Sequence, residues 1–449
     1  MSESATVAGR IQAGRASRGT VPRTAHATWS PAPDRPDPID LLRQSDRQRL
    51  PHLLAIRYGR MLASPLAFLR GAAAVMASDL AATPTTGIQV QLAGDAHLAN
   101  FGGYGTPERN VVFGVSDFDE TLPGPWEWDI KRLVASVVVA GRSRHLSAAD
   151  CSAAATACVR SYRQRMAEHA RMRYLALYHA QIDEAMIRSS LSRPADRKAV
   201  RKGVNRARSR DNLQALSTMT TMVDGHARIK DDPPLVTHIS DPRLGDVAGQ
   251  ITRRYLNTLQ ADRVALLRRY SFVDVALKVV GVGSVGTRCF IVLLMGAGED
   301  DPLFLQIKQA QASVLEPYLG ASLWKNHGQR VVTGQRTIQA ASDIFLGWGH
   351  QGRVHYHVRQ LRDMKVTIDV SAMRASDLSA YAALCGWALA LAHARSGDPA
   401  RISGYLGTSD RFDRALAAFA NAYADQTERD HALLVKAVNE GRVPAQPGV

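Results

Sequence analysis

Hydrophobic and polar residues follow helical spacing in some stretches of the chain and alternate in others. Residues 88–92 alternate between apolar and polar side chains and predict a strand. Beyond Trp128 the apolar residues recur every three or four positions, and Ser147 is a typical N-cap for a second, longer helix. The same spacing predicts helices beginning near Asp40, over 65–80 and from Ser376 onward.

The region from 273 to 361 is instead typical of strands. Runs of β-branched and other apolar residues occupy 275–280, 289–295 and 303–308, and a glycine-rich acidic turn separates the last two. Two further strands are predicted at 344–348 and 354–361. Helices on both sides of an antiparallel sheet region indicate an α+β protein.

Domain organisation follows from these shifts in composition. Residues 1–35 contain five arginines among Ala, Ser, Thr and Pro with no apolar period, so we predict a disordered basic tail over 1–38. We expect large-lobe helices in 39–270, a small lobe containing the sheet in 271–365, and a helical segment that completes the large lobe in 366–449.

The bulk composition narrows the class of protein. The 449 residues are 45% hydrophobic and 22% charged, as in a soluble globular protein, and the net charge of +15 favours anionic partners. The four cysteines are too unevenly spaced for a zinc site, and we expect them to be reduced and buried. The apolar runs 133–140 and 290–295 are too short to span a bilayer, so we expect a cytoplasmic protein without membrane insertion.

A basic cluster between 188 and 210 contains nine Lys or Arg residues against the single acid Asp196. A solvated helix face is favoured over a nucleic-acid site, because no aromatic residue is interleaved for stacking on bases. Nucleic acid therefore stays a less favoured partner.

Candidate catalytic residues follow the first predicted strand. Asp95 stands five residues before Asn100, and Asp117 and Asp119 follow the apolar run 111–115. Phosphoryl transfer needs a carboxylate that orients the attacking hydroxyl and accepts its proton, and oxygen ligands that hold Mg²⁺ on the nucleotide phosphates. We predict Asp95 as the base, Asn100 and Asp117 as metal ligands, and Asp119 as a further candidate ligand.

The alternative is that Asp95 and Asn100 cap turns, a common role for these residues. The Asp-Phe-Asp sequence at a suitable distance makes the combined pattern more specific than either part. Glu120 is the alternative to Asp119 as a second acidic ligand, and both acids could instead be solvated.

A glycine-rich loop lies at 281–286, where Gly281, Gly283 and Gly286 complete a G-x-G-x-x-G pattern that also contains Ser284. A dinucleotide-binding fold requires a helix directly after such a loop, but here a strand-like run follows. A strand, a glycine loop and a second strand form the hairpin that covers ATP phosphates in kinases. These four residues are therefore candidate nucleotide ligands.

The next predicted strand ends in Lys308, where an ammonium group could pair with the α- and β-phosphates. Glu316 is the candidate partner that positions it. A lysine at a strand end is more often simply an exposed charge. The glycine loop before it is the reason for favouring a role in phosphate binding.

The order of these parts is the reverse of that in ordinary kinases, where the glycine loop precedes the catalytic loop. A conventional order would need a catalytic loop after about Leu391. The His-Ala-Arg-Ser-Gly-Asp run at 393–398 is superficially similar, but Ser403 stands five residues after its Asp, where an Asn is required. We therefore expect a circularly permuted chain in which 393–398 either lines the cleft or ends a helix.

The run 93–100 resembles the H-G-D-x-H-x-x-N loop of aminoglycoside and choline phosphotransferases, with Ala93 in place of the first histidine, and the Asp-Phe-Asp resembles their metal motif. Residues 124–129 are similar to a downstream segment whose aspartate anchors the catalytic loop, a structural role that the resemblance assigns to Asp129. It implies a protein-kinase-like two-lobed fold.

Several longer stretches resemble the bacterial family known as domain of unknown function 2252. They are 60–71, 94–102, 117–125, 329–335 and 340–348. The resemblance covers nearly everything after the basic tail.

We expect an ATP- and Mg²⁺-dependent phosphotransferase that acts on an unknown small-molecule or protein acceptor. A close alternative is transfer of AMP on the same fold. An alternative from another class is a non-catalytic nucleotide sensor or nucleic-acid-binding protein.

Overall fold

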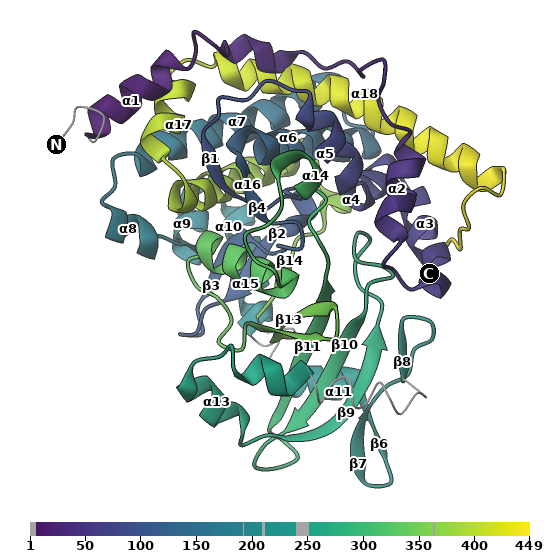
Figure 1. Cartoon of the computed structure of the whole chain (residues 1–449). Coiled ribbons are helices and arrows are strands. Elements are labelled where there is room, and N and C mark those ends of the chain that lie inside the picture. Colours follow the sequence, from purple (N-terminus) through teal and green to yellow (C-terminus); the bar gives the residue numbers. More distant parts are fainter. Residues whose placement is uncertain (1–5, 192, 209–211, 239–250, 362–363) are drawn as a thin grey trace.

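The structure is a computed structural model that describes residues 6–191, 193–208, 212–238, 251–361 and 364–449. Helices gather in one part of the molecule and a large sheet lies below them in Figure 1. Every strand ladder between the described strands is antiparallel, which confirms the prediction of a mixed helix and sheet protein with antiparallel pairing.

Four long helices form the centre of the helical part. They are α6 (Trp126–Ser143), α7 (Ala148–His169), α16 (Ala375–Ser396) and α18 (Arg411–Asn439). Ser147 caps α7 as predicted, since its hydroxyl accepts a hydrogen bond from the backbone N–H of Asp150. Gly386 lets α16 approach α7 closely, because a Cβ there would lie 2.2 Å from the carbonyl oxygen of Cys158.

Among the described helices, α16 alone is long and apolar enough to cross a membrane by length and composition. Its apolar stretch is longer than the runs noted in the sequence, because over 380–394 only Gly386 and His393 interrupt the apolar residues. Of its most apolar window, 61% is buried inside the protein. All four cysteines are buried, as predicted, three of them in this helical core.

The large sheet has six strands in the order β12-β13-β11-β10-β9-β8. Its strands are β8 (Val236–His238), β9 (Ser271–Lys278), β10 (Cys289–Met295), β11 (Pro302–Ala310), β12 (Gly347–Gln351) and β13 (Val354–Gln360). The predicted strand 289–295 is observed with the same bounds, whereas the strand predicted at 344–348 begins only at Gly347. β8 pairs with β9, so the sheet extends beyond the predicted 271–365 range.

Smaller ladders hold the segment around 94–119. A four-stranded sheet has the order β14-β2-β3-β5, and β1 pairs with β4. These strands are β1 (Gln89–Leu92), β2 (Phe101–Gly105), β3 (Val111–Val115), β4 (Leu122–Pro125), β5 (Ile182–Asp183) and β14 (Val366–Thr367), and a separate hairpin joins β6 (Thr220–Val223) to β7 (His226–Ile229).

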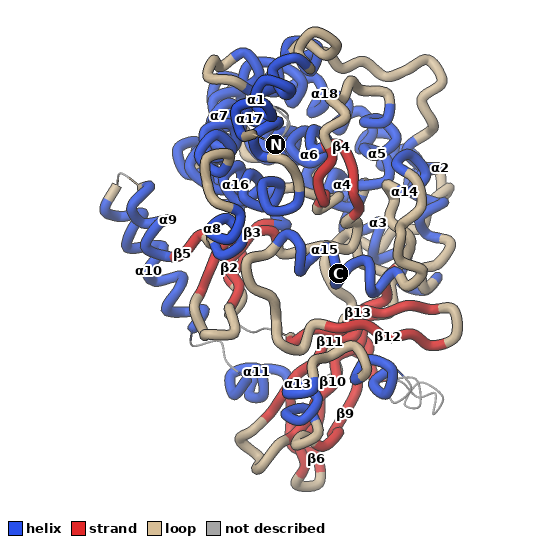
Figure 2. Tube along the Cα trace, turned by 60° about the vertical axis from the view of Figure 1, so that its left-hand side comes forward, coloured by secondary structure: helices blue, strands red, loops and turns tan. Residues whose placement is uncertain are grey.

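The remaining helices surround these elements. The helix predicted over 65–80 is divided at Ala72 into α4 and α5, and α15 lies between the helical part and the sheet (Figure 2). They are α2 (Pro38–Asp46), α3 (Leu54–Leu62), α4 (Pro65–Gly71), α5 (Ala73–Ala81), α8 (Tyr174–His179), α9 (Glu184–Ser190), α10 (Pro194–Arg208), α11 (Asn212–Met219), α13 (Ala261–Leu267), α14 (Glu316–Leu319), α15 (His327–Ile338) and α17 (Pro399–Leu406).

The N-terminal segment is folded from residue 6, and the prediction of a disordered tail over 1–38 is wrong there. Helix α1 (Val7–Ala16) crosses α17, where a Cβ on Gly14 would lie 1.9 Å from the carbonyl oxygen of Arg401. Arg18 and Arg23 donate hydrogen bonds to the last carbonyls of α17, which no intrahelical N–H can satisfy. The arginines that suggested a solvated tail therefore fix it in place. Residues 1–5 lie outside the described residues.

Candidate active site

The loop after β1 is held by Asp129 at the start of α6. The Asp129 carboxylate accepts hydrogen bonds from the backbone N–H groups of Ala93 at 2.6 Å and Gly94 at 3.0 Å. Gly94 has φ +86°, and a Cβ there would lie 2.3 Å from the carbonyl oxygen of Glu120, so only glycine fits. The loop and the acidic segment after β3 are thereby brought together.

Asp95 projects from this loop toward a cavity. Arg132 donates two hydrogen bonds to Oδ1 of Asp95, from Nε at 2.9 Å and from Nη2 at 2.7 Å. The other oxygen, Oδ2, lies 3.6 Å from Nε2 of the buried His97. Arg132 thus fixes the carboxylate and leaves Oδ2 directed at the cavity.

Asn100 and Asp117 lie on adjoining loops. The amide of Asn100 donates a hydrogen bond to the carbonyl oxygen of Asp95 at 2.9 Å, which directs its side-chain oxygen away from that carbonyl. The Ser116 N–H donates to the Asn100 carbonyl at 2.9 Å and joins the two loops. Asp117 follows directly, and its Oδ1 accepts a hydrogen bond from the N–H of Asp119 at 3.2 Å.

Lys308 pairs with Asp119. Its ammonium donates to Oδ2 of that carboxylate, and only 4% of the Lys308 side chain is exposed. Burial lowers the pKa of Lys308, but the charges of Asp119 and Asp117 outweigh it, so that the pKa is raised overall. Ser284 of the glycine loop donates to the same Oδ2 of Asp119 at 3.3 Å.

Glu316, the predicted partner of Lys308, is turned elsewhere. Its carboxylate accepts a hydrogen bond from the Ser313 N–H and lies 3.9 Å from Nε of Arg330. The prediction fails because the chain turns into α14 after β11, which points Glu316 at α15. Asp119 takes the position that Glu316 was expected to fill.

The glycine loop between β9 and β10 rests against the helices α2 to α4. Arg49 donates a hydrogen bond to the carbonyl oxygen of Val285, and Arg60 donates to that of Gly281. The Leu50 N–H donates to the carbonyl of Gly286, whose φ of +89° favours glycine. The loop is closed over the site in this conformation.

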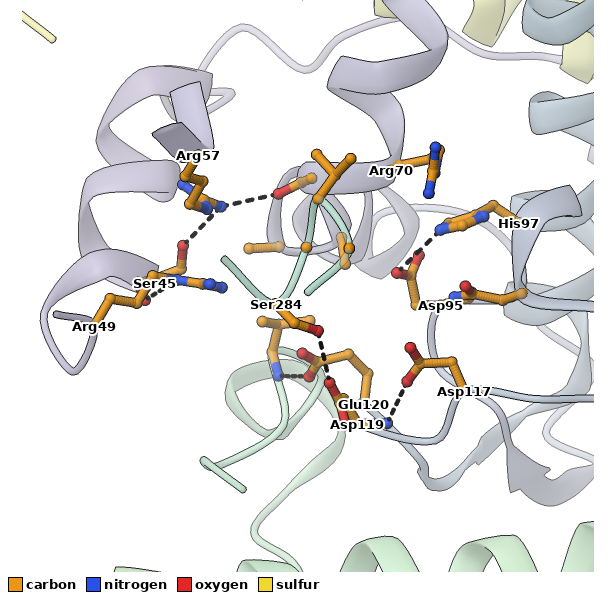
Figure 3. Close-up of a pocket in the computed structure, with 18 residues that line it drawn as sticks. Ser45, Arg49, Arg57, Arg70, Asp95, His97, Asp117, Asp119, Glu120 and Ser284 are labelled. Atoms are coloured by element: carbon orange, nitrogen blue, oxygen red, sulfur yellow. Dashed lines mark hydrogen bonds and ion pairs between the residues drawn. The ribbon is translucent and has the colours of Figure 1, made fainter. Parts of the chain in front are cut away.

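Most of the residues predicted as site residues line one cavity (Figure 3). It is lined by Asp95, Asn100, Asp117 and Asp119 from the segment 94–119 and by Gly281, Gly283 and Ser284 from the glycine loop. Its volume is about 90 Å³, below the roughly 300 Å³ at which pockets for drug-sized ligands begin. Gly286, Lys308 and Glu316 do not line it.

Comparison with known protein families identifies the family of this chain. A model of the DUF2252 family, described as uncharacterized proteins conserved in bacteria, matches residues 49–437. The chain belongs to the DUF2252 family. Neither the curated proteins nor the solved structures contain a significant match to the chain.

The cavity of this DUF2252 protein has a basic wall that the sequence did not predict. Arg49 and Arg57 lie on the same side of the cavity as Ser45, and Arg70 lies on the other side, beside His97 and Asp95. The sequence did not single out these arginines as site residues. Arg57 and Arg70 lie in ordinary amphipathic helices, and Arg49 lies in the turn after α2. Arg70 alone lies in a stretch that resembled the family, 60–71, and that resemblance could have drawn attention to it.

Two further titratable groups line the cavity. Burial lowers the pKa of His97 to about 4, so the imidazole is neutral at pH 7. Burial raises the pKa of Glu120 to about 7, although Arg330 and the Val314 N–H oppose the shift. Glu120 accepts a hydrogen bond from that N–H at 2.8 Å, so the second ambiguous acid is partly buried and bonded to the backbone.

The run at 393–398 does not reach this cavity. His393 is fully buried, where Nε2 lies 3.2 Å from Oδ2 of Asp129 and Nδ1 lies 2.9 Å from the hydroxyl of Tyr162. Asp398 caps α17 through the N–H groups of Ala400 and Arg401. Of the two expectations for this run, the helix end is the correct one, and His393 supports Asp129.

The donors in the cavity suit Mg²⁺ better than a metal that needs a complete protein cage. The described residues contain no group of three or more His, Cys, Asp or Glu side chains arranged to hold a metal ion. Mg²⁺ usually takes one or two carboxylates and completes its shell with phosphate oxygens and water. Asp117 and the Asn100 amide oxygen fit that role, whereas Asp119 already binds Lys308.

Proposed function

We propose that the protein is an ATP- and Mg²⁺-dependent phosphotransferase with a circularly permuted, kinase-like arrangement. The observation that carries the proposal is the single cavity between the catalytic segment and the glycine loop, which lie almost two hundred residues apart in the sequence. The contact from Lys308 to Asp119 supports it, because Lys308 lies on β11, the second strand after the glycine loop.

Asp95 acts as the base in this proposal. An acceptor hydroxyl attacks the γ-phosphorus of ATP, a new O–P bond forms, and the bond to the β-phosphate oxygen breaks to release ADP. The hydroxyl proton passes to Oδ2 of Asp95, while Arg132 holds Oδ1. The transition state of phosphoryl transfer is loose, so orientation of the hydroxyl by Asp95 contributes more than the strength of the base.

The other residues position the phosphates. Mg²⁺, when bound, neutralises charge on the β- and γ-phosphates, and Asn100 and Asp117 would hold it. Lys308 exchanges part of its contact with Asp119 for a phosphate oxygen. The glycine loop lifts away from Arg49 and Arg60 to admit the nucleotide, because the closed cavity is too small for it.

Calorimetric titration with ATP and Mg²⁺ tests the proposal. We expect the wild-type protein to bind ATP in a Mg²⁺-dependent manner and Asp117→Ala to lose that dependence. Asp300→Asn, which changes an exposed acid in the turn between β10 and β11, is the control and should bind like the wild type. Absence of ATP binding by the wild-type protein overturns the proposal.

A labelling assay distinguishes phosphoryl transfer from AMP transfer. ATP labelled at the γ-phosphate and ATP labelled at the α-phosphate are each incubated with the protein and a bacterial metabolite extract. Phosphoryl transfer moves the γ label to the acceptor and leaves the α label in ADP. Transfer of the α label to the acceptor supports the AMP alternative.

A further inference from the structure

Arg70 differs from Arg49 and Arg57 in having no hydrogen bond or ion pair, although the nearby charge of Asp95 opposes the lowering of its pKa by burial. Arg57 donates hydrogen bonds to Asp46 at 2.9 Å and to the carbonyl of Gly71 at 3.0 Å, and Arg49 is bonded to the glycine loop. No described residue forms a hydrogen bond or an ion pair with the guanidinium of Arg70, and its Nε is buried. The residue as a whole is only partly buried, so its two terminal nitrogens keep donors that a ligand in the cavity can use.

The position of Arg70 places this cation on the acceptor side of the cavity. It lies beside His97 and Asp95, whereas Arg49 and Arg57 lie across the cavity (Figure 3). Asp95 is already paired with Arg132, so Arg70 is not needed to neutralise it. The α4 backbone that carries Arg70 is fixed, because Arg132 also donates to the carbonyl of Leu69 at 2.6 Å.

We infer that the acceptor carries an anionic group, a phosphate monoester or a carboxylate, which Arg70 binds while Asp95 takes the proton of its hydroxyl. This inference rests on the proposed function, and it adds the acceptor's chemical class. Arg70 donates two parallel hydrogen bonds to such an anion, an arrangement that fixes orientation as well as charge. The neutral imidazole of His97 and the small side chains of Ala73 and Ala74 leave space beside it.

The forked guanidinium of Arg70 fixes the orientation of an acceptor that it binds. An acceptor held by two hydrogen bonds at Arg70 presents its hydroxyl to Oδ2 of Asp95 in one pose, which converts a diffusional encounter into a positioned reaction. A neutral acceptor lacks this contact and leaves the guanidinium of Arg70 without an anion to bind. The site thus selects anionic alcohols over neutral ones.

Binding of inorganic phosphate to the full-length protein tests the inference. Phosphate is titrated by ³¹P NMR line broadening in the presence of saturating AMP-PNP and Mg²⁺, and acetate is titrated in parallel by calorimetry as the carboxylate probe. We expect saturable binding of at least one probe by the wild type, at least tenfold weaker in Arg70→Gln. Arg353→Gln, an exposed arginine between β12 and β13, is the matched control and should bind like the wild type.

Tighter binding of phosphate assigns a phosphate monoester, and tighter binding of acetate assigns a carboxylate. Equal binding by wild type and Arg70→Gln overturns the inference, as does displacement of the probe by AMP-PNP, because Arg70 would then contact the nucleotide. If AMP-PNP does not bind at all, the proposed function fails. The titration without nucleotide then still decides whether Arg70 holds an anion.

Discussion

The ion pair between Lys308 and Asp119 allows a structural role to be separated from a role in ATP binding. Lys308→Met keeps the apolar stem of the side chain and removes the charge. Loss of one partner of a buried ion pair costs about 3–5 kcal/mol. Because the Asp119 side chain is 29% exposed and can be partly solvated, we expect the lower end, about 3 kcal/mol.

The same change should weaken ATP binding. A hydrogen bond to a charged group contributes about 1.5–3 kcal/mol, which corresponds to a roughly 10- to 150-fold rise in the dissociation constant. Calorimetry measures this affinity, and urea unfolding measures the stability. Lys325→Met changes an exposed lysine and should alter neither.

The double variant Lys308→Met/Asp119→Asn decides between the two roles. It removes the unpaired carboxylate, so most of the lost stability should return. ATP affinity should stay low, because no cation meets the phosphates. If affinity returns together with stability, Lys308 serves only to pair with Asp119 and the reasoning about the phosphate contact is wrong.

Four further outcomes are expected. Asp95→Asn should slow ATP turnover by about 10²–10⁴-fold with little change in ATP affinity, and unchanged turnover contradicts its role as base. Asp129→Asn should lower the free energy of unfolding by about 2–4 kcal/mol and speed amide hydrogen exchange in 94–100, whereas equal exchange rates rule out anchoring. Arg35→Gln should cost about 3–5 kcal/mol in urea unfolding, because Arg35 donates to both buried carboxylates Asp79 and Asp430; the exposed Arg15→Gln is the control. For Glu120 the folded pKa of about 7 lies above its ordinary value of 4.5, so its contribution to stability is complete below about pH 4.5 and is lost as the pH rises to about 7. Glu120→Gln should flatten this dependence of the unfolding free energy on pH, and an unchanged slope refutes the assignment.

The sequence predicted the parts of this structure that depend on local pattern. The strand at 289–295 and the cap at Ser147 follow from alternation and from side-chain hydrogen bonding within a few residues. Asp95, Asn100 and the Asp-Phe-Asp segment were singled out by spacing that is itself local, and the structure brings Asp95, Asn100, Asp117 and Asp119 to one cavity. Their catalytic and metal-binding roles stay predictions.

Long-range pairing was not predictable in this way. Lys308 pairs with Asp119 instead of Glu316, because the partner of Lys308 depends on how the large sheet packs against the segment 94–119. The N-terminal arginines looked like a solvated tail, since only the fold reveals the unsatisfied carbonyls of α17 that they bind. Arg70 was missed for a related reason, because only its lack of a partner in the folded chain sets it apart.

The contact between His393 and Asp129 has a consequence for synthesis of the chain on the ribosome. The two residues are 264 positions apart, a stretch that takes roughly 10 to 50 s to translate at about 5–20 residues per second. Throughout that interval the helix that carries Asp129 has neither α16 nor α18 to cover its apolar face. Nascent chains of this protein should therefore bind chaperones for longer than those of proteins with local contacts, and chains released before α16 should aggregate.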